Sequence, residues 1–221
     1  MTIRLHHIPI SRSFRVIWML EELGLEAEII EHSIRRGTMY TPEIQGVSPA
    51  SRAPAVEIDG IPMIESGAIL EYLAETHPDA GLGVAIGAPI RARYLQLMHF
   101  AETQAAQIEQ LNMQHVFLRD PAMASVTTMK LNTKRLQLTM RALEGMIEES
   151  GYLLPTGFSA ADIMFGLNLR LARYYVHLEE YPKVLAYRDR LIERPAYNAA
   201  LAKDGEQEIY TQDFYPLPEG A

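Results

Sequence analysis

Residues 54–73 decide the fold of this chain, and they read PAVEIDGIPMIESGAILEYL. Two short apolar runs, 54–58 and 61–64, flank Asp59-Gly60, a dipeptide typical of two-residue β-hairpin turns. A helical pattern starts at Ser66 and ends near His77-Pro78. Its inward positions are Ile69, Leu70 and Leu73. The stretch therefore predicts two antiparallel strands followed directly by a helix.

The residues before this stretch alternate between strand and helix signals. We expect a strand over 3–8, a helix over 13–23 that Gly24 ends, and a second strand over 26–33. A short helix then opens at Pro42, because proline suits the first helical position. The order βαβ, short helix, ββα differs from a doubly wound sheet and is typical of a thioredoxin-like α/β domain.

The rest of the chain shows helical signals only. Residues 80–89 are rich in glycine and small residues and are expected to form a linker. Helices are expected over 90–118 (continuous or broken), 125–149, 159–176, 182–192 and 195–201. We therefore predict a thioredoxin-like domain over 1–79 and an all-α helical domain over 90–221.

Composition restricts the possible functions. The formal net charge is −8, which disfavours nucleic acid and anionic membranes as partners. The chain has no cysteine, so disulfides, thiolate metal sites and cysteine nucleophiles are excluded. No signal peptide or spanning segment is evident, and the expectation is a cytoplasmic protein. His6 and His7 lack a third ligand at a metal-binding spacing, and we expect one to face the core and the other the solvent.

Four segments resemble the glutathione transferase family in order and spacing across the whole chain. They are SRSFRVIWMLEELG at 11–24, SPASRAPAV at 48–56, IESGAILEYL at 64–73 and FSAADI at 158–163. The second departs from the family pattern at Ser48, Ser51 and Ala53. The resemblance is to cytosolic, serine-type members, since cysteine-type chemistry needs a protein thiol.

The resemblance implies a glutathione site in the first domain. Ser66 and the helix N-terminus would bind the γ-glutamyl carboxylate, and Glu65 would accept from the neighbouring ammonium group. The Ala53-Pro54 peptide bond would be cis, which would leave the Ala53 backbone free to pair with the cysteinyl unit. Arg52 would reach the glycyl carboxylate. The alternatives are a plain helix cap with a solvated glutamate, a proline at a strand start and a surface arginine.

Ser11 is the expected catalytic hydroxyl. Serine-type family members carry their serine at this position, where it donates a hydrogen bond to the glutathione thiolate. Lowering a thiol pKa from ~8.5 by about two units requires about 2.7 kcal/mol. A hydrogen bond to a charged group contributes about 1.5–3 kcal/mol and a helix N-terminus roughly 0.3–1 kcal/mol. Ser13 is the rival, although it is expected to be the N-cap of the helix.

The second domain carries a cap signal and a weaker pocket signal. Ser159 and Asp162 have the spacing of a capping box, which should begin the core helix of this domain. Candidates for the second-substrate pocket, which serve equally well as core residues, are Met113, Phe117, Tyr174 and Phe214.

The sequence and the resemblance together indicate a glutathione transferase that activates the glutathione thiolate for attack on a small electrophile in detoxification. Glutathione is then a co-substrate, no permanent cofactor or metal is expected, and the partner is a second copy of the chain in a homodimer. The alternatives are a non-catalytic glutathione-binding or interaction protein of the same fold, and a glutathione-dependent isomerase or peroxidase.

Overall fold

The computed structural model describes residues 1–218, except for the side chain of Glu43. These residues form two compact units. The first comprises residues 1–91 together with 192–208, and the second comprises residues 92–191 together with 209–218. The first is a thioredoxin-like α/β unit and the second is helical, as the sequence predicts.

The first unit is built on a four-stranded sheet in the order β2-β1-β3-β4. The central strand β1 (Ile3–His7) pairs in parallel with β2 (Glu28–Glu31) and antiparallel with β3 (Ala55–Ile58). The strand β4 (Ile61–Ile64) completes the predicted hairpin. Its turn residues Asp59 and Gly60 have φ of 50° and 80°, the left-handed values that such a tight turn requires.

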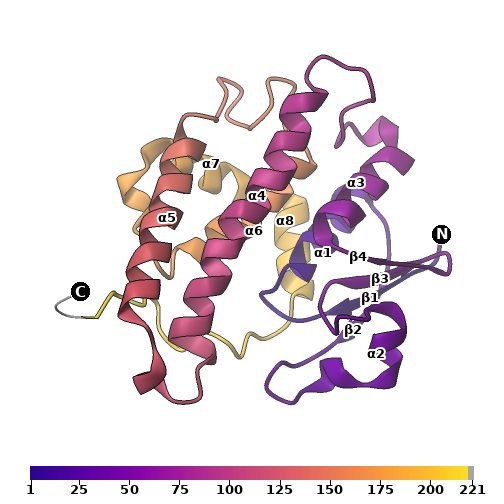
Figure 1. Ribbon diagram of the computed structural model, residues 1–221. Coiled ribbons are helices and arrows are strands. Elements are labelled where there is room, and N and C mark those ends of the chain that lie inside the picture. The colour runs from indigo at the N-terminus through magenta and orange to yellow at the C-terminus, as the bar shows by residue number, and fades with distance from the viewer. Residues whose placement is uncertain (219–221) are drawn as a thin grey trace. The chain divides into compact units, whose positions relative to one another are not determined.

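Helices cover both faces of this sheet (Figure 1). The helix α1 (Ser13–Leu23) packs on α3 (Ser66–Thr76), and the short α2 (Pro42–Val47) contacts β3 from the opposite side. Because β1 is central and covered on both faces, His6 and His7 are each only 1% exposed. The expectation that one of them faces the solvent is therefore wrong.

The segment 192–208 belongs to the first unit, although the sequence places it in the helical domain. Its helix α8 (Pro195–Lys203) runs against α1, where the Tyr197 ring meets Trp18 edge-on at a centroid distance of 4.9 Å. Arg194 and Glu22 join the same two segments through an ion pair of 2.7 Å. The apolar face of α8 is thus buried against the thioredoxin-like fold.

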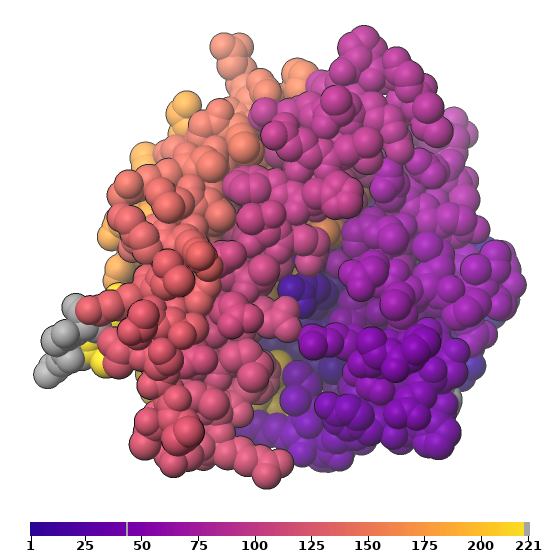
Figure 2. Space-filling model, viewed as in Figure 1, coloured from indigo at the N-terminus to yellow at the C-terminus, as the bar shows by residue number. Residues whose placement is uncertain are grey.

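The helical unit contains three long helices and one shorter one. The helices α4 (Arg91–Asn112) and α5 (Val126–Glu144) lie side by side on its surface (Figure 2). The expected long helix over 90–118 breaks at Asn112 into a π-helical turn, Met113–Phe117. The helix α6 (Ala160–Ala172) is buried along nearly its whole length, and α7 (Pro182–Ile192) follows it.

The capping box at the start of α6 is present as predicted. The Asp162 carboxylate accepts hydrogen bonds from the Ser159 N–H at 2.8 Å and the Leu153 N–H at 3.1 Å. It also accepts from the hydroxyls of Ser159 and Tyr187, each at 2.9 Å. Asp162 therefore connects the loop before α6 to α7, which is more than a helix cap alone would do.

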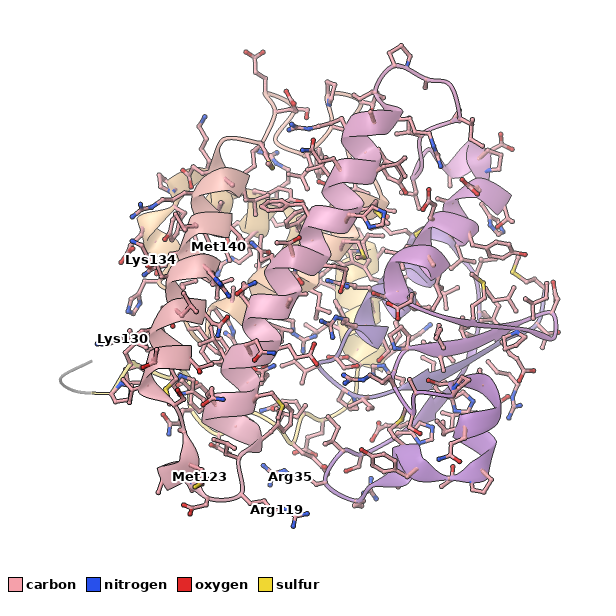
Figure 3. The ribbon with its side chains drawn as sticks, in the orientation of Figure 1. Arg35, Arg119, Met123, Lys130, Lys134 and Met140 are labelled. Carbon is pink, nitrogen blue, oxygen red and sulfur yellow. The ribbon has the colours of Figure 1, made fainter. Side chains whose placement is uncertain are left out.

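The surface of the helical unit carries exposed cations despite the negative net charge. Lys130 and Lys134 lie one turn apart and project outward from α5 (Figure 3). Among residues 1–218, none of the helices combines the length and the apolar character that a membrane crossing requires.

Candidate functional site

Three loops meet at one end of the sheet in the first unit. In the strand register, His6 of β1 lies opposite Ala55 of β3, and Ala55 lies opposite Ile64 of β4. The loop after β1, the loop before β3 and the start of α3 consequently leave the sheet at the same end. This register brings to one end of the sheet the loops that carry Ser11, the Ala53-Pro54 pair and Glu65-Ser66.

Ser11 is half-buried in the loop between β1 and α1. The residue before it, Ile10, has φ of 58°, a left-handed conformation that a β-branched side chain rarely adopts. The Ile10 N–H donates to Oδ1 of Asp204 at 3.1 Å, and this contact holds the turn in place. The strained turn places Ser11 two residues before the start of α1.

Ser13 is the first residue of α1, and it is not the N-cap that the sequence suggests. The N-cap position is Arg12, without a side-chain cap. The Ser13 hydroxyl is instead buried, and it receives the Ile8 N–H at 3.1 Å. It also lies 2.8 Å from the Ser11 hydroxyl and 2.8 Å from Nδ1 of His7. The Ser13 hydroxyl therefore bonds to these residues of the preceding strand and loop and does not cap the helix.

His7 and Asp204 extend this chain of hydrogen bonds into the core. Nε2 of His7 lies 2.8 Å from the backbone oxygen of Asp204 and 3.5 Å from its carboxylate oxygen Oδ1. The Asp204 side chain is 1% exposed. The other histidine of β1, His6, points to the opposite face and pairs with His32 at 3.0 Å.

The start of α3 presents a polar pair backed by a buried cation. Ser66 is the first residue of the helix and does not cap it, because the N-cap position is Glu65. Glu65 is exposed and has φ of 69°, a strained value for this residue type. The guanidinium of Arg15, 0% exposed, donates to the Ser66 hydroxyl at 2.9 Å. The arrangement places positive charge behind a helix N-terminus.

Arg15 is a candidate site residue that the sequence motifs alone do not single out. It lies in α1 between Phe14 and Val16, both fully buried. A cation within such an apolar run is a usable signal, because an arginine is almost never fully buried unless it has partners.

The Ala53-Pro54 peptide bond is cis, as the resemblance implies. The departures from the family pattern before it have local explanations. The buried Ser48 hydroxyl accepts from the Arg52 N–H and donates to the Arg52 oxygen, each at 3.0 Å. Ser51 has φ of 52°, the conformation that the family's glycine would favour. The Arg52 side chain is exposed at this end of the sheet.

The four residues expected in the second-substrate pocket have different environments within the helical unit. Met113 is 44% exposed and Phe117 is half-buried, both in the π-helical turn. Tyr174 is buried and stacks on Tyr210 at a centroid distance of 3.9 Å. Phe214 stacks on His177 at 4.3 Å. Tyr174 therefore packs within the unit, and the other three retain accessible surface.

Within residues 1–218, no cluster of three or more histidine, aspartate or glutamate side chains is arranged to hold a metal ion. The polar groups at this end of the sheet instead suit a small zwitterionic ligand. Such a site on a thioredoxin-like unit, together with a separate all-helical unit, defines a two-domain class of thioredoxin-like proteins.

Comparisons with known proteins show which family within that class this chain resembles. A family model described as glutathione S-transferase, N-terminal domain, matches residues 1–75. Glutathione S-transferase 3 of Schizosaccharomyces pombe is 29% identical over 90% of this chain and 86% of its own length. Disulfide-bond oxidoreductase YfcG of Escherichia coli is 28% identical over 91% of this chain and 95% of its own.

Solved structures of similar proteins show the same fold. A glutathione transferase homologue from Lodderomyces elongisporus, solved with two glutathione molecules per subunit, superposes with a TM-score of 0.84. At 19% identity, over 92% of this chain and 99% of that one, this likeness shows the shared fold. The match over residues 1–75, the full-length relatives and the shared fold together support a member of the glutathione transferase family.

Proposed function

We propose that this chain is an active glutathione transferase, which binds glutathione in its first unit and activates the thiol for attack on an electrophilic carbon. The observation that carries the proposal is the half-buried Ser11 hydroxyl at the sheet end that also presents Glu65 and Ser66. A thiol placed beside Ser11 would be within reach of a hydroxyl and the N-terminus of α1.

The binding groups match the two ends of glutathione. The γ-glutamyl carboxylate is assigned to the N-terminus of α3 at Ser66, where Arg15 adds positive charge, and the ammonium to the exposed Glu65 carboxylate. The Ala53 backbone before Pro54 would pair with the cysteinyl unit, and Arg52 would bind the glycyl carboxylate. Each end of the ligand thereby meets a group of opposite charge.

The helical unit is assigned the electrophile. Met113, Phe117 and Phe214 are the proposed contacts, since they retain accessible apolar surface, and the buried Tyr174 would support them from within. The functional form is proposed to be a homodimer. Isomerase and peroxidase reactions use the same thiolate, and a panel of substrates would separate them from transfer.

The first experiment is an ultraviolet titration of the thiolate in bound glutathione. We expect the bound thiol to have a pKa about two units below the ordinary ~8.5, because one charge-assisted hydrogen bond and a helix N-terminus supply the free energy needed. The difference spectrum of protein with and without glutathione, recorded from acid to alkaline pH, measures this directly. S-methylglutathione, which has no ionisable thiol, is the control.

The rival function is a glutathione-binding protein without catalysis. It would show normal affinity for glutathione, an unshifted thiol pKa and no turnover of any electrophile. That combination of results would replace the transferase proposal with the binding proposal, because the fold alone does not guarantee activity.

Arg15→Met tests the carboxylate site. We expect the dissociation constant for glutathione to rise about 10- to 150-fold, because a charge-assisted contact contributes about 1.5–3 kcal/mol. S-methylglutathione should lose affinity equally, since the change affects the carboxylate end and not the thiol. Calorimetric titration measures both ligands. The matched control is the exposed Arg135 on α5, whose replacement by methionine should leave both constants unchanged. Unaltered affinity in Arg15→Met would remove Arg15 from the site.

A further inference from the structure

A continuous line of hydrogen-bonded groups leads from the proposed thiol site into the core of the first unit. It runs from the Ser11 hydroxyl to the Ser13 hydroxyl at 2.8 Å, and from there to Nδ1 of His7 at 2.8 Å. Nε2 of the same imidazole reaches the Asp204 backbone oxygen at 2.8 Å. All members except Ser11 are buried, so the line joins a ligand-accessible hydroxyl to an enclosed base.

The direction of each hydrogen bond follows from the donors and acceptors. A backbone carbonyl only accepts, so Nε2 of His7 carries a proton and donates to Asp204. In the neutral imidazole Nδ1 is then the acceptor, and the Ser13 hydroxyl donates to it at 2.8 Å, with the Ile8 carbonyl oxygen as a second, longer acceptor at 3.2 Å. These two acceptors use the single Ser13 proton, so Ser11 donates to Ser13, which also receives the Ile8 N–H.

Ser11 therefore faces a ligand as a hydrogen-bond acceptor while His7 is neutral. Its own proton points inward to Ser13, and its oxygen also receives the Ser13 N–H at 3.3 Å. A hydroxyl in this state can accept a hydrogen bond from a thiol, but it cannot donate one to a thiolate. Stabilising a thiolate requires every proton along the line to move inward by one position.

We propose that His7 receives the thiol proton of bound glutathione through the hydroxyls of Ser11 and Ser13, and that Asp204 stabilises the imidazolium so formed. This inference rests on the proposed function. His7 acts through two other groups, so it is a positioning residue and proton store, whereas Ser11 is the group that contacts the sulfur.

The transfer conserves every proton. The S–H bond breaks and its proton binds to Ser11, the Ser11 proton moves to Ser13, and the Ser13 proton moves to Nδ1 of His7. The products are a thiolate and an imidazolium, with no change of oxidation state. The directions of the hydrogen bonds are now reversed: His7 donates to Ser13, Ser13 donates to Ser11, and Ser11 donates to the thiolate.

The charges around His7 favour the imidazolium. An ordinary thiol holds its proton about 100-fold more tightly than an ordinary imidazole, so transfer needs a compensating negative charge. The Asp204 carboxylate supplies it at 3.5 Å from Nε2. Glu31 on β2 is the strand partner of His7 and adds a second carboxylate on this side of the sheet.

The contacts of the other elements near His7 are apolar, or involve groups paired elsewhere, such as Lys203, which pairs with Glu21. On the β3 side, the residues next in register are the apolar Pro54 and Ala55. The helix α1 contributes Ser13, and its buried cation Arg15 is directed to Ser66. Asp204 and Glu31 are therefore the charged groups that the printed contacts and the strand register place beside the imidazole.

A proton count on the unaltered protein tests the relay. If His7 stores the thiol proton, thiolate forms on glutathione binding at neutral pH without release of a proton to the buffer. If the thiol ionises to solvent instead, one proton appears per thiolate. Binding heats in buffers of different ionisation enthalpy give the count, and thiolate absorbance gives the number of thiolates. S-methylglutathione corrects for protons exchanged by the other groups of the ligand.

His7→Asn provides the variant, because its amide oxygen can still accept from Ser13 but does not take up a proton at neutral pH. We expect the thiolate fraction and kcat to fall about 10- to 100-fold, as the thiol pKa returns toward ~8.5. The affinity for S-methylglutathione should stay within about twofold, since the variant leaves the ligand-binding groups intact. His6→Asn is the matched control: His6 is equally buried on the same strand, but it pairs with His32.

The outcomes separate this inference from the proposed function. Absence of thiolate in the unaltered protein would overturn the proposed function itself. Thiolate accompanied by one released proton, or an equal loss of thiolate in His6→Asn and His7→Asn, would overturn only the relay. If His7→Asn does not fold, the proton count on the unaltered protein still decides between the two.

Discussion

Ser11→Ala is expected to lower kcat for glutathione conjugation about 10- to 150-fold, because a hydroxyl donating to a charged acceptor contributes about 1.5–3 kcal/mol. The KM for glutathione should change little, since the proposed binding groups lie at other positions, on α3 and before β3. The thiol pKa of bound glutathione should rise together with the loss of kcat. Steady-state kinetics with an activated aryl halide and the thiolate titration measure the two effects.

The matched variants for this prediction are Ser11→Thr and Ser13→Ala. Threonine keeps a hydroxyl at position 11, so it should retain much of the activity that alanine loses. Ser13→Ala interrupts the line between Ser11 and His7 but leaves the Ser11 hydroxyl in place. Full activity in Ser11→Ala, with activity lost in Ser13→Ala, would transfer the catalytic role to Ser13.

Much of the fold could be predicted because its signals are local. The Asp59-Gly60 turn, the helix end at Gly24 and the capping box at Ser159 each depend on a few neighbouring residues, and the structure confirms each of them. The placement of α8 depends on a distant contact between Tyr197 and Trp18. Helical periodicity does not show which unit a helix packs against.

The residues of the candidate site likewise fall into those that local motifs predict and those that depend on contacts between distant parts of the chain. Motif position alone suggested Ser11 and Ser66, and the register of the strands brings their loops to one end of the sheet. Asp204 lies 197 residues after His7, so no spacing rule connects the two. Because serine usually caps a helix, a cap is the prediction for Ser13 and the alternative for Ser66, whereas here their hydroxyls contact His7 and Arg15.

Asp162→Ala should lower the free energy of unfolding by about 3–4 kcal/mol at neutral pH. The carboxylate is completely buried, and its removal leaves the N–H groups of Leu153 and Ser159 and the Tyr187 hydroxyl without their acceptor. A lost N-cap alone would cost only about 1 kcal/mol. Urea unfolding measures the difference. Replacing the exposed Asp189 of the same unit by alanine is the control and should change stability by less than about 0.5 kcal/mol.

The cost of Asp162→Ala should also depend on pH. Burial raises the pKa of Asp162 from 3.8 to about 6, against the lowering effect of its hydrogen bonds to Tyr187, Leu153 and Ser159. The folded protein thus binds this proton more tightly than the unfolded chain does. The resulting stabilisation is complete below the unfolded pKa and is lost as the pH rises through about 6.

The variant lacks this proton, so its deficit in unfolding free energy should grow by up to about 3 kcal/mol between neutral pH and pH ~4. Unfolding curves of both proteins at several pH values in that interval give the difference directly. Parallel curves would mean that the hydrogen-bond donors around the carboxylate offset its desolvation. In that case Asp162 would bind its proton equally in the folded and unfolded states, and the lost acceptor alone would determine the cost of removing it.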